Sequence, residues 1–163
     1  MTPKSLLRHP RAVSRPVDLT EGAFTEILDD AQGADPNAVR RLILCSGKIY
    51  YDVVEAREKS NAGDIALVRV EQFYPYPERL MGDIIGKYHA AREIVWLQEE
   101  PRNMGAWSFM QERLRQQLRD GQSLRYIGRG AAASPATGSM KLHQQNQRQI
   151  LDAVVGGHSL LAL

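Results

Sequence analysis

The sequence predicts an α/β layered domain with a mostly parallel sheet. After residue 40, short apolar runs alternate four times with longer stretches whose apolar residues recur at helical spacing. Parallel neighbouring strands need crossovers of a dozen or more residues, and these stretches supply them. A chain of 163 residues is also long enough to bury one full hydrophobic core.

Four apolar runs predict the strands, because each run is short and is bounded by turn-forming or charged residues. The run RLILC at residues 41–45 is stopped by Ser46 and Gly47, and Pro75 and Pro77 stop the run that begins at Ile65. The expected strands span residues 41–45, 65–73, 93–97 and 124–127.

Four helices are expected in the stretches between and after these strands. Pro77 suits the first turn of the second helix, because that position needs no backbone N–H donor. The expected helices cover residues 48–59, a stretch from Pro77 to about Tyr88, residues 106–119 and residues 140–155. Their expected apolar faces are Tyr51, Val54 and Ala56; Leu80, Ile84, Ile85 and Tyr88; Trp107, Met110, Leu114 and Leu118; and Leu142, Ile150, Ala153 and Val154.

Residues 1–38 differ from the rest and predict an irregular arm and linker ahead of a domain at 39–163. The segment holds four prolines and no long periodic run. Asp18 is expected to cap a short helix that extends through Leu28, and a polar turn follows at 29–37. Five basic residues precede the first acidic one. We interpret them as an arm that is solvated or docks on another surface; an arm that binds phosphate is the alternative.

Composition excludes several classes of function. The net charge of +2 argues against nucleic-acid binding, and no window approaches the roughly 18 apolar residues of a membrane span. No signal-peptide pattern precedes Asp18, and the single Cys45 lies in an apolar run as a core residue rather than a nucleophile, so a cytoplasmic location is expected. The four histidines are scattered without metal-ligand spacing, and no catalytic set can be assembled.

Three loops are expected at the carboxyl ends of the strands, where open α/β sheets bind ligands and partners. They are residues 46–48, 99–105 and 129–139. In the first loop, Gly47 lets backbone amides approach an anion at the start of a helix. The full phosphate-loop pattern is absent, so a tight strand-to-helix turn is the plainer interpretation.

The stretch QEEPRNMGAW, residues 98–107, is the most distinctive of the chain. Glu99 and Glu100 are adjacent in an extended segment and are expected to face opposite ways, which disfavours a catalytic carboxylate pair. We expect one of them to accept backbone amides or a basic partner and the other to face an interface. Asn103 is expected to bond its own backbone, and Gly105 to adopt a conformation closed to other residues. The pattern predicts an interface or ligand loop, stiffened by Pro101 and followed by Trp107 packing at the helix start.

This stretch resembles a signature of the C-terminal domain of 2-oxoglutarate dehydrogenase, the thiamine-diphosphate-dependent component of its complex. Other resembling segments follow in the family's order: MTPKSLLRHP, LCSGKIYYDVVEARE, IALVRVEQFYPYP, YIGR, ASPATGSMKLH and QQNQRQILDA. The resemblance implies a transketolase C-terminal-like fold, a three-layer α/β/α sandwich with a mixed, mainly parallel sheet of five strands. One strand therefore remains to be found, near Leu6 and Leu7 or within 36–40. A related 2-oxoadipate enzyme shares many of these segments.

The resemblance also implies that the cofactor site of the intact enzyme lies outside this segment. Thiamine diphosphate and magnesium belong to upstream domains; neither Gly63-Asp64-Ile65 nor Gly82-Asp83-Ile84 matches the G-D-G motif that begins their site. The arm resembles the exit from the preceding pyrimidine-binding domain. The intact enzyme decarboxylates 2-oxoglutarate and passes a succinyl group to the lipoyl arm of the dihydrolipoyl succinyltransferase component, whereas this segment alone is expected to be inactive.

Two further roles follow from the resemblance. The first is assembly of a homodimer, for which the expected interface loop comprises Gln98, Glu99, Glu100, Pro101, Asn103, Gly105 and Trp107. The second is an allosteric acyl-CoA site, for which Ser46, Lys48 and Arg129 are candidates because phosphate groups favour basic partners. Gly130 stands where some family members carry a second arginine, which weakens this second role. The alternative to all of these is a freestanding module of the same fold that senses CoA or a nucleotide.

Overall fold

The computed structural model describes residues 4–156 and confirms the α/β class. It contains a five-stranded sheet in the order β1-β3-β2-β4-β5, in which only the β1–β3 pair is antiparallel. The strands are β1 (Ile27–Leu28), β2 (Arg41–Cys45), β3 (Ile65–Val70), β4 (Glu93–Pro101) and β5 (Ser123–Arg129). The helices are η1 (Lys4–Arg8), α1 (Pro16–Thr20), α2 (Ile49–Ser60), α3 (Glu78–Lys87), α4 (Trp107–Gln117) and α5 (Met140–Val155).

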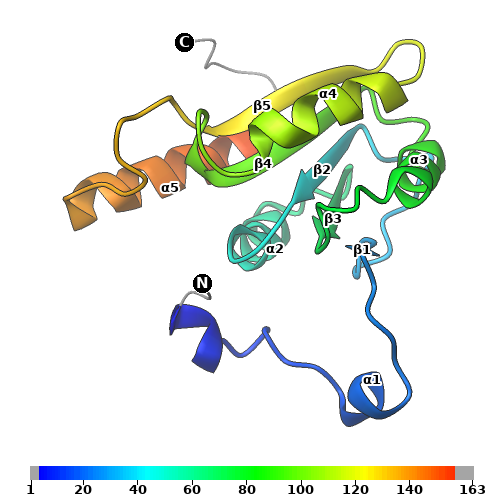
Figure 1. The fold of residues 1–163 in the computed structure, drawn as a ribbon, viewed down its shortest axis with the longest axis horizontal. Helices are drawn as coiled ribbons and strands as arrows, with labels where there is room; N and C mark the ends of the chain where they lie inside the picture. The colour runs from blue at the N-terminus through cyan, green and yellow to red at the C-terminus, as the bar shows by residue number, and fades with distance from the viewer. Residues whose placement is uncertain (1–3, 157–163) are drawn as a thin grey trace.

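Helices cover both faces of the sheet, which gives the expected three layers (Figure 1). Successive strand residues point to opposite faces. Accordingly, Leu42 and Leu44 of β2 belong to the core shared with α3 and α4, whereas Ile43 and Cys45 belong to the core shared with α2 and α5. Burial raises the pKa of the Cys45 thiol, which fits the expected core residue.

Three of the predicted helical faces need correction. Helix α2 buries Ile49, Val53 and Arg57, none of which belongs to the predicted apolar face. The reason is Arg57, whose guanidinium pairs with the buried carboxylate of Asp30, an acceptor that also receives the backbone N–H of Leu67 at 3.0 Å. Helix α3 buries Met81 as well as Ile85, while Leu142 at the start of α5 stays exposed. No helix within residues 4–156 is long and apolar enough to cross a lipid bilayer.

The fifth strand lies where a helix was expected, and that prediction is wrong. Helix α1 ends at Thr20, and its Asp18 accepts a hydrogen bond from the backbone N–H of Arg15 at 2.9 Å rather than capping a helix through Leu28. Residues 27–28 form β1 and pair with Val70 and Arg69. The predicted alternatives near Leu6 and within 36–40 hold no strand. A two-residue strand with one buried side chain carries too little pattern to be read from sequence. The domain boundary at residue 38 stays a prediction, although β1 precedes it and joins the sheet.

Strand β4 extends further than predicted, and this extension shapes the distinctive stretch. It continues through residues 98–101, with an irregularity between Leu97 and Pro101 in its pairing to β5. Strand β5 likewise runs to Arg129 instead of ending at Ile127. Because β4 continues beside the parallel strand β5, the QEEP segment reaches the carboxyl edge of the sheet as extended backbone. The polar residues therefore begin inside the strand rather than in a turn after it.

Candidate functional site

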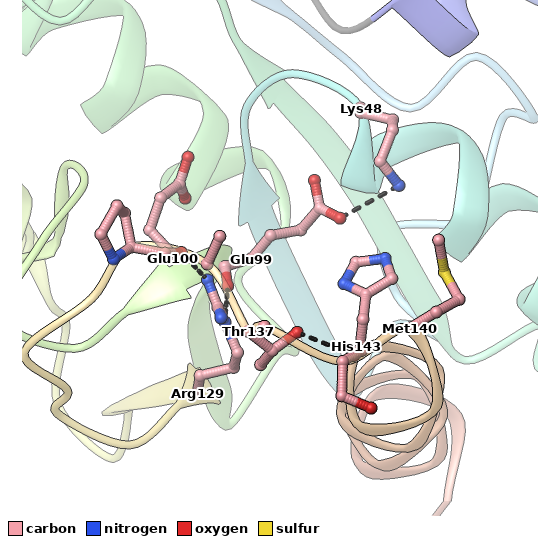
Figure 2. Close-up of a pocket in the computed structure, with 11 residues that line it drawn as sticks. Lys48, Glu99, Glu100, Arg129, Thr137, Met140 and His143 are labelled. Carbon is pink, nitrogen blue, oxygen red and sulfur yellow. Dashed lines mark hydrogen bonds and ion pairs between the residues drawn. The ribbon is translucent and has the colours of Figure 1, made fainter.

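Three loops meet at one edge of the sheet, as the parallel arrangement predicts. Residues 46–48 follow β2, residues 102–106 follow β4 and residues 130–139 follow β5. Since β2, β4 and β5 are parallel neighbours, their carboxyl ends lie side by side. Figure 2 shows one cavity at this edge, with Lys48, with Glu99 and Glu100 at the end of β4, with Arg129 and Thr137, and with Met140 and His143 of α5 around it.

The side-chain amide of Gln98 holds the distinctive stretch together. Its Oε1 accepts hydrogen bonds from the indole Nε1 of Trp96 at 2.9 Å and from the backbone N–H of Trp107 at 3.0 Å. Its Nε2 donates to the carbonyls of Met104 at 2.8 Å, Pro101 at 3.2 Å and Glu100 at 3.3 Å. Gln98 is only 4% exposed, so these bonds form where water cannot replace them. One buried residue thus links the strand, the turn and the first residue of α4.

Gly105 lets the turn close over this amide. Its φ of +65° lies in the left-handed region, where a side chain is strained. A Cβ at this position would also lie 2.9 Å from Nε2 and 3.0 Å from Oε1 of Gln98. The expected role of this glycine is therefore confirmed, and its cause is the close approach of the Gln98 amide.

Glu99 and Glu100 point apart, as expected for adjacent residues of a strand (Figure 2). Glu99 pairs with the Nζ of Lys48 at 3.0 Å, while Glu100 is exposed. Lys48 also pairs with Asp52 at 2.7 Å. Burial lowers the pKa of Lys48, but the hydrogen bonds to these two carboxylates outweigh it and raise the pKa above its ordinary value. Glu99 thus finds the basic partner that the sequence predicted for one of the two glutamates.

The cavity of Figure 2 has a volume of about 560 Å³ and contains both basic candidates. It is lined by Lys48, Glu99, Glu100, Arg129, residues 135–140 and His143. Arg129 donates from Nε to the carbonyl of Glu99 at 2.6 Å and from its NH2 group to the carbonyl of Pro135. Arg129 therefore anchors the 130–139 loop through carbonyls and keeps its positive charge in the cavity, whereas two carboxylates compensate the charge of Lys48.

The third candidate, Ser46, lines a neighbouring cavity instead. That cavity has a volume of about 370 Å³ and is mostly apolar. Its wall includes Gly47, Phe73, Trp96 and Phe109. The structure thus brings Lys48 and Arg129 together and sets Ser46 apart from them.

Asn103 bonds across to the next loop, which corrects the expectation that it bonds its own backbone. Its Nδ2 donates to the carbonyl of Ala132 at 3.0 Å, and its Oδ1 accepts from the backbone N–H of the same residue at 3.0 Å. The side-chain amide of Asn103 thus pairs with both the backbone N–H and the backbone C=O of one residue, which is why it clamps the two loops at the sheet edge.

We expect Asn103→Ala to loosen the 130–139 loop with little effect on the core. Two exposed hydrogen bonds are lost, so the free energy of unfolding should fall by only about 1 kcal/mol. Hydrogen exchange at the Ala132 amide should rise, as measured by NMR. Asn103→Asp keeps the acceptor and should give an intermediate rate. An unchanged rate in the alanine variant would show that Asn103 does not hold the loop.

Two residues at this edge were missed by the sequence analysis. Asp52 was detectable, because it stands four residues after Lys48 on a helix. Tyr126 gave no such signal. Its hydroxyl contacts the carbonyls of Glu100 at 3.1 Å and Arg129 at 3.0 Å, and burial raises its pKa to about 12. The hydroxyl therefore stays protonated as a donor through the physiological range. Among the described residues, no three His, Cys, Asp or Glu side chains could hold a metal ion.

Fold and sheet edge together define an α/β domain of the transketolase C-terminal type. The sequence pattern of a family described as 2-oxoglutarate dehydrogenase C-terminal matches residues 13–155. The match covers most of the chain, and the chain belongs to this family. The resemblance carried by QEEPRNMGAW and its companion segments is thereby confirmed.

Relatives in several bacteria are named 2-oxoglutarate dehydrogenase E1 component. The one from Cupriavidus necator is 46% identical over 153 residues, which is 94% of this chain. Those from Haemophilus influenzae and Azotobacter vinelandii are 41% and 42% identical, each over 93% of this chain. The chain spans 16% of the length of each of these three relatives.

Proposed function

We propose that this chain is the C-terminal domain of an oxidoreductase, a 2-oxoglutarate dehydrogenase E1 component, and serves its assembly. Family membership and the names of the relatives support this proposal. The intact protein decarboxylates 2-oxoglutarate with thiamine diphosphate and magnesium held by upstream domains. It then transfers succinyl to the lipoyl group of its dihydrolipoyl succinyltransferase partner. A cytoplasmic location is part of the same proposal.

Catalysis is assigned to the upstream domains, so the 163-residue chain alone is expected to be inert. The test measures ferricyanide reduction with 2-oxoglutarate and with 2-oxoadipate, in the presence of thiamine diphosphate and magnesium. The intact protein should turn over 2-oxoglutarate, and the chain alone should turn over neither acid. Turnover by the chain alone would contradict the assignment, and a preference for 2-oxoadipate would move the intact protein to the related enzyme.

The single observation that supports an assembly role is the construction of the 98–107 stretch. Gln98, Pro101 and Trp107 are buried within the domain and hold the backbone in one shape. The exposed residues Glu100 and Arg102 project from this fixed base. A surface that is already ordered loses little conformational freedom on binding, which favours its use as an interface. The proposed homodimer contact therefore uses the outer residues of the stretch, while the buried ones support them.

Charge reversal on this outer surface tests the interface. In the intact protein, Glu100→Arg and Arg102→Glu should each raise the dimer dissociation constant by about tenfold or more, because charged groups at an interface are arranged to meet complementary charge and a reversal turns that attraction into repulsion. Sedimentation equilibrium measures the constant. Glu112→Arg is the control, since Glu112 is an exposed residue of α4. An unchanged constant in both loop variants would exclude this surface from the dimer.

Acyl-CoA binding is a second candidate, favoured by the placement of Lys48 and Arg129 in one cavity. A CoA phosphate would have to compete with Glu99 and Asp52 for Lys48, which leaves Arg129 as the principal cation. In a calorimetric titration of the intact protein with acetyl-CoA, Arg129→Ala should weaken binding at least about tenfold. Ser46→Ala should have no effect, because Ser46 lines the other cavity. Absence of heat with the unaltered protein would remove this candidate, and tight binding by the chain alone would favour a freestanding sensing module.

A further inference from the structure

The basic arm, defined here as residues 4–15, contacts helix α2 through a fork of hydrogen bonds. The two terminal nitrogens of Arg11 donate to the two carboxylate oxygens of Glu58 at 2.8 and 2.7 Å. The arm lies beside α2 in the fold (Figure 1). Such two-point pairing fixes direction as well as distance, which a single ion pair does not.

Two more contacts converge on the same face of α2. Gln32 donates from Nε2 to Oε1 of Glu58 at 2.8 Å, so this carboxylate joins the arm and the 29–37 turn to the helix. The centroid of the His9 ring lies 5.0 Å from that of the Tyr51 ring, and Tyr51 precedes Glu58 on α2 by about two turns of the helix. The hydrogen bond from Arg11 is the main cause that lowers the pKa of Glu58, so the carboxylate is ionised at neutral pH.

Apolar burial contributes little to the placement of the arm. Leu7 and Val13 are 77% and 76% exposed, and η1 buries no residue. A specific charge pair holds the arm instead. The arm carries Lys4, Arg8, His9, Arg11 and Arg15, and α2 carries Asp52, Glu55 and Glu58 beside its own Arg57 and Lys59. Asp52 and Glu55 pair with Lys48 and Lys59, which leaves Glu58 as the partner of Arg11.

We propose that Glu58 is the anchor point that holds the arm against α2 and so sets the path by which the chain enters the domain. We call the group of contacts around it the charge clasp. The clasp consists of Arg11, Glu58 and Gln32, with the His9–Tyr51 ring pair beside it. Because both charged side chains of the fork are 41% exposed, the clasp opens reversibly and weakens as salt screens it. It goes beyond the proposed function and requires no catalytic step.

Hydrogen exchange of the arm tests the clasp in the intact protein. Glu58→Arg and Arg11→Glu should each raise exchange in residues 5–13 by roughly two- to fivefold, the range that an exposed pair allows. The Arg11→Glu/Glu58→Arg double variant should return exchange toward the original rate. Glu55→Arg is the matched control, because it makes the same charge change on α2 without touching the fork. Exchange in the original protein should also rise when salt is raised.

Each outcome decides for or against the fork. Rescue by the double variant with no effect of Glu55→Arg supports the clasp. Equal effects of Glu58→Arg and Glu55→Arg would replace it by diffuse attraction, and unchanged exchange in both single variants would overturn it. Because the readout is confined to the arm, failure of the clasp is distinguishable from failure of the dimer proposal, which sedimentation measures.

Discussion

Replacing Trp107 with alanine should lower the free energy of unfolding by about 3–5 kcal/mol, the range for removing a large buried aromatic side chain. The side chain is 5% exposed and packs in the core between the sheet, α3 and α4. Its ring lies 5.2 Å from that of Tyr126 on β5. Urea denaturation of the 163-residue chain, followed by circular dichroism, measures the change.

Two comparisons make this expectation specific. Trp107→Phe keeps most of the ring volume and should cost clearly less than the alanine variant. Trp107→Ala should leave the proposed dimer of the intact protein in place under conditions where the variant remains folded, because the backbone N–H that donates to Gln98 is retained and the buried ring makes no outer contact. A loss of stability below about 1 kcal/mol would contradict the core assignment, since such values are typical of surface substitutions.

Replacing Gln98 with alanine should cost roughly 2–5 kcal/mol, because buried donors are left without acceptors. The indole Nε1 of Trp96 and the backbone N–H of Trp107 both lose their partner. The carbonyls of Pro101 and Met104 lose the donor that draws the turn inward. The measurement is again the free energy of unfolding from urea denaturation, combined with hydrogen exchange across residues 99–107.

Controls separate the lost network from the lost side chain. Gln98→Glu keeps both acceptor bonds to Oε1 but places a second oxygen against the carbonyls, so it should also destabilise the chain. Gln116→Ala removes an exposed glutamine from α4 and should change the free energy of unfolding by less than about 0.5 kcal/mol. Equal effects of Gln98→Ala and Gln116→Ala would mean that the amide does not organise the turn.

The sequence predicted the sheet well where its strands are long and apolar. The strands β2, β3 and β4 were found because each buries consecutive residues on both faces. Strand β5 buries only Ile127 and was found from the short run LRYI that precedes a loop of small residues. Strand β1 was lost because it has two residues, of which only Ile27 is buried. The buried face of α2 was predicted wrongly because a charged residue such as Arg57 is expected on the surface. Arg57 is buried because it pairs with Asp30, which lies 27 residues away in the sequence.

At the sheet edge, the sequence predicted which segments meet but not how they are joined. Chain direction alone placed Lys48, Glu99 and Arg129 at one edge. The organising role of Gln98 could not be predicted, because the five hydrogen bonds of its side-chain amide depend on how the chain turns back over it. The Asn103 clamp was unpredictable for the same reason, since Ala132 contributes only backbone atoms.

The central claim is that Gln98 shapes the 98–107 stretch for assembly, and dimer affinity of the intact protein tests it most directly. Leu114→Ala serves as the matched variant, because Leu114 is a fully buried core residue of α4 outside the stretch. Both variants lose stability, so a difference between them in dimer dissociation constant reports the stretch itself. We predict that Gln98→Ala raises the constant at least about tenfold and that Leu114→Ala leaves it near the original value. Equal constants for the two variants would contradict the claim.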